Sequence, residues 1–95
     1  MNKYEVMFIV KPDMEEAQIT KVAEDLKKVL TDNNAKLLEE KAMGQRELAY
    51  EIKKFKTGYY FLFVVEAEAI AVSEFDRIAK INENILRHLI IKVEE

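Results

Sequence analysis

The sequence predicts an α+β fold in which a strand, a helix and a strand are followed by a second strand, helix and strand. Two segments carry apolar residues at three- and four-residue intervals, and four segments are rich in β-branched and aromatic residues. These elements alternate in two halves of similar length. The chain has 95 residues, enough for one hydrophobic core and too few for the core to divide, so we expect a single domain over residues 1–95.

The first half begins with a strand over Tyr4–Val10, where nearly every residue is apolar, and Pro12 ends it. Asp13 is the expected N-cap of the following helix, because Glu15 and Glu16 then lie in the first turn, near the positive end of the helix dipole. The helix is expected to end near Asn33–Asn34. Its apolar face consists of Ile19, Val22, Ala23, Leu26, Val29 and Leu30.

The next two strands form a hairpin. The first begins at Lys36–Lys41 and resumes through Leu48–Ile52, with Gly44 between the two parts, which predicts a bulge or a bend. Lys56–Gly58 is the expected turn. The second strand of the hairpin covers Tyr59–Val65, and it is apolar on both faces.

The second half ends with a helix over Ala69–Ile81, closed by Asn82–Asn84, and a strand over Ile85–Val93. This order is the split βαβ, ferredoxin-like pattern: right-handed crossovers place two helices on one face of a four-stranded antiparallel sheet. The first and third strands are expected in the centre, and the charged second strand at an edge. Residues that would protect this edge from unwanted pairing are Lys36, Glu39, Glu40, Lys41 and Arg46.

Composition argues against an enzyme. There is no cysteine, which excludes disulfides, thiolate nucleophiles and cysteine-bound zinc, and suits a reducing cytosol. His88 is the only histidine, with no Ser or Cys partner arranged nearby, so a structural or interfacial role is expected. No glycine-rich phosphate loop, signal segment or membrane-spanning apolar run is visible. We expect a cytoplasmic protein with no cofactor, no metal site, no membrane contact and no small-molecule substrate.

A cluster of cations stands out because the chain is acidic. The chain has fifteen Lys and Arg and eighteen Asp and Glu, which gives a net charge of −3. Nucleic-acid binding would therefore have to come from a local patch of positive charge. Lys53, Lys54 and Lys56 lie within four residues and beside several aromatic rings, which is consistent with phosphate contact or with a solvated turn. Cations on the first and last strands would add to it. The candidate RNA contacts are Lys3, Lys53, Lys54, Lys56, Arg87 and Lys92.

The aromatic residues of the third strand leave two interpretations open. Lys56–Phe63 partly matches the RNA-recognition-motif pattern, in which rings stack on bases, although Tyr60 stands where that motif prefers Gly or Ala. Such a platform requires solvent-facing Tyr59 and Phe61. If these rings instead share a face with Phe63, they pack beneath the helices. A ligand-binding regulatory domain of the same fold is a further alternative.

The order of elements and several segments resemble the bacterial small-subunit ribosomal protein S-six (S6) family, over essentially the whole chain. One of these segments is Gly44–Ile52, in which the part around Arg46–Tyr50 is the most specific. The other segments that carry the resemblance are Tyr4–Val6 with Pro12, Gly58–Tyr60, Glu74–Ile81 and Ile85–Lys92.

This resemblance implies a structural component of the 30S subunit. It implies binding to the central domain (the platform) of 16S ribosomal RNA together with ribosomal protein S-eighteen (S18), the two proteins acting as a heterodimer. The partner edge would be the strand around Gly44. This chain would supply Lys41, Arg46 and Tyr50 there. Gln45 and Glu47 stand where many relatives carry positive or uncharged side chains, so Arg46 is expected to matter more than its neighbours.

Overall fold

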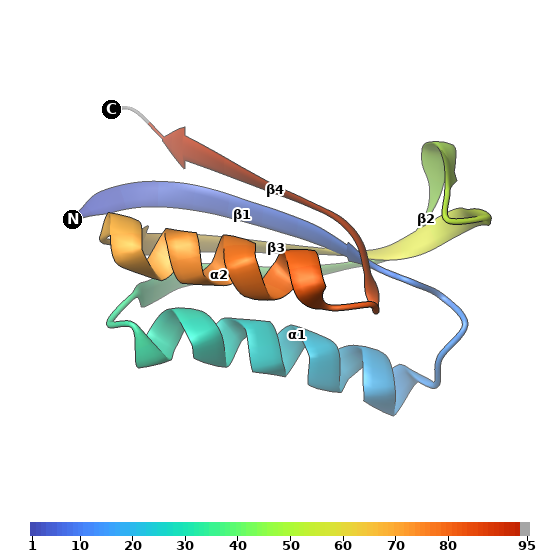
Figure 1. The fold of residues 1–95 in the computed structure, drawn as a ribbon, viewed down its shortest axis with the longest axis horizontal. Helices are drawn as coiled ribbons and strands as arrows, with labels where there is room; N and C mark the ends of the chain where they lie inside the picture. The colour runs from blue at the N-terminus through green and yellow to red at the C-terminus, as the bar shows by residue number, and fades with distance from the viewer. Residues whose placement is uncertain (94–95) are drawn as a thin grey trace.

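Four strands form one antiparallel sheet with both helices on one face (Figure 1). The structure, a computed structural model, describes residues 1–93. The elements are β1 (Asn2–Val10), α1 (Glu16–Asp32), β2 (Lys36–Ile52), β3 (Phe55–Ala67), α2 (Ala69–Ile81) and β4 (Ile85–Val93). The strand order β2-β3-β1-β4 places the two most apolar strands in the centre. The predicted fold class and strand positions are therefore confirmed.

Phe8 lies at the centre of the core between sheet and helices. It is fully buried, and its ring stacks on Phe61 at 5.2 Å between centroids. Two further rings lie 5.3 Å and 6.1 Å away, those of Phe63 on β3 and Phe75 on α2. Leu26 of α1 closes the core from the other helix and is equally buried. Alternate residues of β1 and β3 thus supply one aromatic layer that both helices cover.

The opposite face of the sheet has no helix over it (Figure 1). Because side chains alternate along a strand, this open face carries the residues between the core positions. Met7, Tyr60 and Leu89 are examples, and none of them is fully buried. The open face is therefore partly apolar and available for contact.

Beyond the sheet, β2 and β3 continue as a two-stranded arm, residues 46–58. β3 pairs with β1 only from Tyr59 onward, whereas its preceding residues pair with β2 alone. Figure 1 shows this green-to-yellow part bending away from the rest of the sheet. Register shifts interrupt β2 between Leu37 and Glu39, between Ala42 and Gly44, and between Glu47 and Ile52. The second shift confirms the irregularity expected at Gly44, whose φ is +79°.

The turn of the hairpin lies at Lys53–Lys54, so the turn predicted at Lys56–Gly58 is wrong. Both lysines have a left-handed backbone conformation, with φ of 49° and 72°. Two-residue hairpin turns require this conformation because it matches the twist of the flanking strands. Gly58 lies within β3 instead. A Cβ there would overlap Ile9 Cγ2 and lie 3.3 Å from the carbonyl oxygen of Val10. Close approach of a neighbouring strand, and not a turn, explains this glycine.

The start of α1 also differs from expectation. Its N-cap is Glu15 and not Asp13, and the Glu15 N–H donates to Oε1 of Gln18 at 3.3 Å. This is one half of the reciprocal capping arrangement in which the third helical residue satisfies the cap backbone. Asp13 remains in the preceding loop, where its carboxylate lies 3.8 Å from Lys11 Nζ. The predicted helix end is confirmed at Asp32.

Gly58→Ala is expected to destabilise the protein by about 1–3 kcal/mol, because the added methyl group overlaps Ile9 and the strands cannot separate without losing their pairing. Gly44→Ala is the matched control: its site is open and the cost is backbone strain alone, about 1 kcal/mol. Urea unfolding of both variants measures the difference. A Gly58→Ala variant as stable as the parent would contradict the close approach.

Candidate nucleic-acid interface

Most helix cations are already paired with carboxylates. The pairs on the helices and adjoining segments are Lys11–Asp13, Lys21–Asp25, Lys27–Glu24, Lys27–Glu40, Lys41–Glu39, Arg77–Glu74 and Lys80–Asp76. Among residues 1–93, none of the candidate RNA contacts lies within 4 Å of a carboxylate oxygen. The same is true of Lys28, Lys36 and Arg46. The arm lysines together with Lys3, Arg87 and Lys92 therefore keep their charge available for a polyanion.

Three of these cations lie together on the arm. Lys53 and Lys54 form its turn, and Lys56 is the second residue of β3; all three are exposed. Left-handed backbone is uncommon for lysine, so two lysines in this turn are costly for the fold. The arm thus presents a compact positive tip at the end of the molecule.

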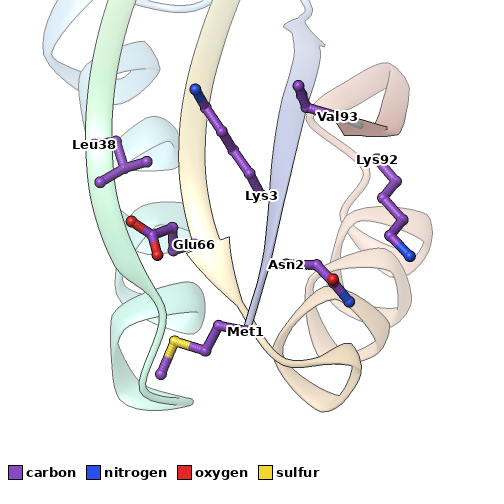
Figure 2. A pocket seen from close by; sticks show the side chains of 7 residues that line it. All are labelled: Met1, Asn2, Lys3, Leu38, Glu66, Lys92 and Val93. Carbon is purple, nitrogen blue, oxygen red and sulfur yellow. The ribbon is translucent and has the colours of Figure 1, made fainter. Parts of the chain in front are cut away.

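Lys3 and Lys92 lie at the other end of the sheet. They line a hollow together with Met1, Asn2, Leu38, Glu66 and Val93 (Figure 2). Lys3 pairs with Glu66 in the sheet register, and ten residues of β3 separate Glu66 from Lys56, roughly 30 Å. The ammonium groups of Lys3 and Lys92 point in different directions (Figure 2). The candidate RNA contacts are therefore spread over two ends and do not form one cluster.

Arg87 connects the last strand with the arm. Its Nη1 donates to the hydroxyl of Tyr50 at 2.6 Å, a link between β4 and the irregular part of β2. Both side chains also line a groove of about 210 Å³. Its walls are Met7, Ile9, Leu48, Ala49, Tyr50, Ile52, Tyr60, Arg87 and Leu89. The sequence predicted an RNA contact at Arg87 and a partner contact at Tyr50, and the structure brings these two side chains together.

Leu48 and Ile52 were not among the predicted site residues. Their alternation with Tyr50 was visible in the sequence and indicated a strand with one apolar side. What the sequence did not indicate is where that side faces, because the direction depends on the register shift between Glu47 and Ile52. The shift turns this segment towards the open face, and the groove follows from it.

The predicted partner edge is the free side of β2. Arg46 is exposed and its Nε donates to the carbonyl oxygen of Met43 at 3.3 Å. Lys41 is exposed and lies 3.2 Å from Glu39. Tyr50 has 59 % of its surface exposed. These side chains line β2, which has a neighbouring strand on one side only.

The aromatic rings of β3 do not form a base-stacking platform. Tyr59 and Phe61 pack against the core on the helix-covered face, together with buried Phe63. The ring of Phe61 is also engaged by Phe8. The requirement for solvent-facing Tyr59 and Phe61 is therefore not met, and the prediction that these rings pack beneath the helices is confirmed.

His88 makes a contact between β4 and α2. Its Nε2 lies 2.7 Å from Oδ1 of Asp76, and its ring meets Phe75 edge to face at 6.4 Å. Hydrogen bonds from His88 and then Lys80 lower the pKa of the Asp76 carboxyl below its usual range. Within residues 1–93 no three potential metal ligands are grouped. Neither helix has the length and apolar character to cross a membrane.

Asp76→Asn is expected to remove a pH-dependent part of the stability. A carboxyl whose pKa is lower in the folded than in the unfolded state stabilises the fold above its unfolded pKa, about 4, and this contribution disappears as the pH falls through the folded value. Thermal unfolding of parent and variant should differ at pH 6 and converge in acid, with Asp25→Asn as an exposed control. Identical pH profiles would contradict the stabilising role of the Asp76 carboxyl and its contacts with His88 and Lys80.

Comparison with known proteins agrees with this geometry. A family model described as Ribosomal protein S6 matches residues 3–92. The fold is similar to the crystal structure of 30S ribosomal protein S6 from Thermotoga maritima, with a TM-score of 0.93 and 28 % sequence identity. The match covers 97 % of this chain and 87 % of that one. The chain therefore belongs to the ribosomal protein S6 family, and it is an RNA-binding structural component of the small subunit of the cytoplasmic bacterial ribosome and not an enzyme.

Proposed function

We propose that this protein binds the central domain of 16S ribosomal RNA together with ribosomal protein S18, as a heterodimer. The observation that carries the proposal is the distribution of charge: the helix cations are mostly paired with carboxylates, whereas the arm lysines have no such partner among residues 1–93. Phosphate groups are the natural counterions for exposed, unpaired lysines.

The protein positions RNA and performs no chemistry on it. Lys53, Lys54 and Lys56 contact phosphates at the arm, and Arg87 extends the contact towards the open face. Lys3 and Lys92 meet phosphates at the opposite end of the sheet. Because phosphate contacts fix register and orientation without reading bases, the rigid sheet between the two ends determines their spacing on the RNA.

A partner is needed because the chain is acidic. With a net charge of −3, the protein alone gains little from counterion release, and a basic partner supplies the remainder. S18 docks along the free side of β2, where Arg46 and Lys41 are exposed, and against Tyr50 above the open-face groove. Docking beside a strand edge combines backbone hydrogen bonds with side-chain contacts.

Titration of purified S18 into the protein tests the heterodimer without RNA. The double variant Arg46→Ala and Tyr50→Ala should weaken S18 binding by at least tenfold. Both side chains are exposed, so the loss of the Arg87–Tyr50 hydrogen bond should cost no more than about 1 kcal/mol of stability. Lys21→Ala, on the solvent side of α1, is the control and should bind S18 as the parent does. Equal S18 affinity for the parent and the double variant would refute the β2 assignment.

A further inference from the structure

The second edge of the sheet, β4, is less protected than the first. β4 pairs with β1 alone, so backbone N–H and C=O groups along its other side have no strand partner. β2 is interrupted by three register shifts, whereas the β1–β4 pairing shifts only once, next to Val10, and then runs regularly to Lys3–Val93. The side chains of Leu89 and Ile91 are 39 % and 49 % exposed. A regular and open edge with two exposed apolar side chains is a template for another strand.

The charges of β4 determine which strand fits. Arg87 and Lys92 are exposed, and among residues 1–93 neither has a carboxylate partner within 4 Å. An incoming strand that sets another cation against either of them is repelled, whereas one with aliphatic residues at those positions is accepted. A second copy of β4 can place aliphatic residues opposite both cations: Ile91 opposite Arg87, and Leu86 opposite Lys92.

We propose that two copies of this protein pair antiparallel through β4, centred on Leu89, to form a continuous eight-stranded sheet. A two-fold axis perpendicular to the sheet must lie midway between two copies of the same residue. The reason is that residues directly opposite each other in a sheet point to the same face, so the sum of their numbers must be even. Leu89 is the midpoint of Ile85–Val93, so this register pairs β4 over its whole length. The facing pairs are Leu89 with Leu89, His88 with Ile90, Arg87 with Ile91, Leu86 with Lys92, and Ile85 with Val93.

Neighbouring registers fit less well. Centring on Ile90 sets His88 opposite Lys92, which places two potential cations face to face. Centring on His88 leaves Lys92 beyond the start of the opposing strand, opposite Asn84. The Leu89-centred register alone uses the full strand and sets each cation opposite an aliphatic side chain.

Charge complementarity extends to the next strand. Ile91 pairs with Glu5 of β1 within one copy, so Arg87 of the second copy lies in the same row as Ile91 and Glu5 of the first. The Cα atoms of Arg87 and Glu5 would be about 10 Å apart, two strand spacings, which their long side chains can bridge. The two-fold axis creates this attraction twice.

Pairing goes beyond the proposed RNA function and competes with it. Arg87 belongs to both surfaces, so a β4-paired copy that engages Arg87 with Glu5 does not offer it to phosphate. The two processes also differ in their response to salt: RNA binding weakens steeply, whereas salt screens both the Arg87–Glu5 attraction and the repulsion between two copies of charge −3.

Because the chain contains no cysteine, single-cysteine variants test the register directly. Facing residues of an antiparallel pair have Cα atoms about 4.5–5.5 Å apart, within the reach of a disulfide. Leu89→Cys should therefore form a covalent dimer under mild oxidation. Ile91→Cys should not pair with itself, because the two copies of residue 91 are four positions apart, roughly 13 Å. Mixed with Arg87→Cys, however, it should form a disulfide-linked heterodimer.

Sedimentation equilibrium of the cysteine-free protein completes the test. The parent should move towards the dimer mass with rising protein concentration, and Ile91→Lys, which faces Arg87 of the other copy, should remain a monomer. Leu38→Lys, exposed near the other edge, is the control and should behave as the parent. A parent that stays monomeric, with Leu89→Cys cross-linking no faster than Ile91→Cys, would overturn the proposal. Equal cross-linking of the Leu89→Cys and Ile91→Cys variants, each with itself, would overturn the register.

Discussion

Replacement of Lys53, Lys54 and Lys56 by alanine is expected to weaken binding to central-domain ribosomal RNA, in the presence of S18, by about a hundredfold near 0.1 M salt. Each lysine that neutralises a phosphate contributes about 0.7–0.9 to the slope of log affinity against log salt. The triple variant should therefore lose about 2–3 from this slope. Filter binding or fluorescence anisotropy over a salt series measures both quantities.

Lys54→Gly separates the RNA contact from the fold. Glycine adopts the left-handed conformation of this turn without strain, so the variant should be more stable by up to about 1 kcal/mol and still bind RNA less tightly. Lys21→Ala and Lys28→Ala, on α1, are charge-matched controls that should leave RNA affinity unchanged. A triple variant with the parent's affinity and salt slope would show that the arm does not contact phosphate.

Phe8→Ala is expected to cost about 3–5 kcal/mol of stability, a large share of the roughly 5–15 kcal/mol typical of a small domain. The side chain is fully buried, and three aromatic rings surround it within 6.1 Å, so its removal leaves a cavity that a sheet clamped by two helices cannot close. Urea unfolding followed by circular dichroism measures the loss.

Two further variants calibrate this result. Ile70→Ala removes an apolar side chain of α2 that is 66 % exposed, so it should change stability by less than about 0.5 kcal/mol. Phe8→Leu should lie between the two, because it keeps most of the volume. A Phe8→Ala variant no less stable than Ile70→Ala would contradict the aromatic core.

The fold was predictable because each element has a strong periodic signal. Apolar runs on both faces marked β1 and β3 as central, and the charges of β2 marked it as an edge. The turn was mispredicted because Gly58 is the only glycine near it, whereas the chain turns at Lys53–Lys54. What determines the role of Gly58 is the proximity of Ile9, a contact between distant residues that local propensity cannot indicate.

The candidate site was only partly predictable. Sequence clustering identified the arm lysines correctly as neighbours, since they lie in one hairpin. It could not indicate that Lys3 and Lys92 lie at the opposite end of the sheet, or that Arg87 donates to Tyr50. Those relations depend on strand register and on the irregular segment after Glu47, which only the folded chain determines.

The most direct test of the RNA-platform proposal is the affinity of the protein for a central-domain fragment of 16S ribosomal RNA, measured with and without S18 over a salt series. The charge distribution predicts tight binding to the RNA only when S18 is present. The protein alone should bind the RNA weakly, and its affinity should depend only slightly on salt concentration. Equally tight binding and a steep salt slope without S18 would contradict the proposal.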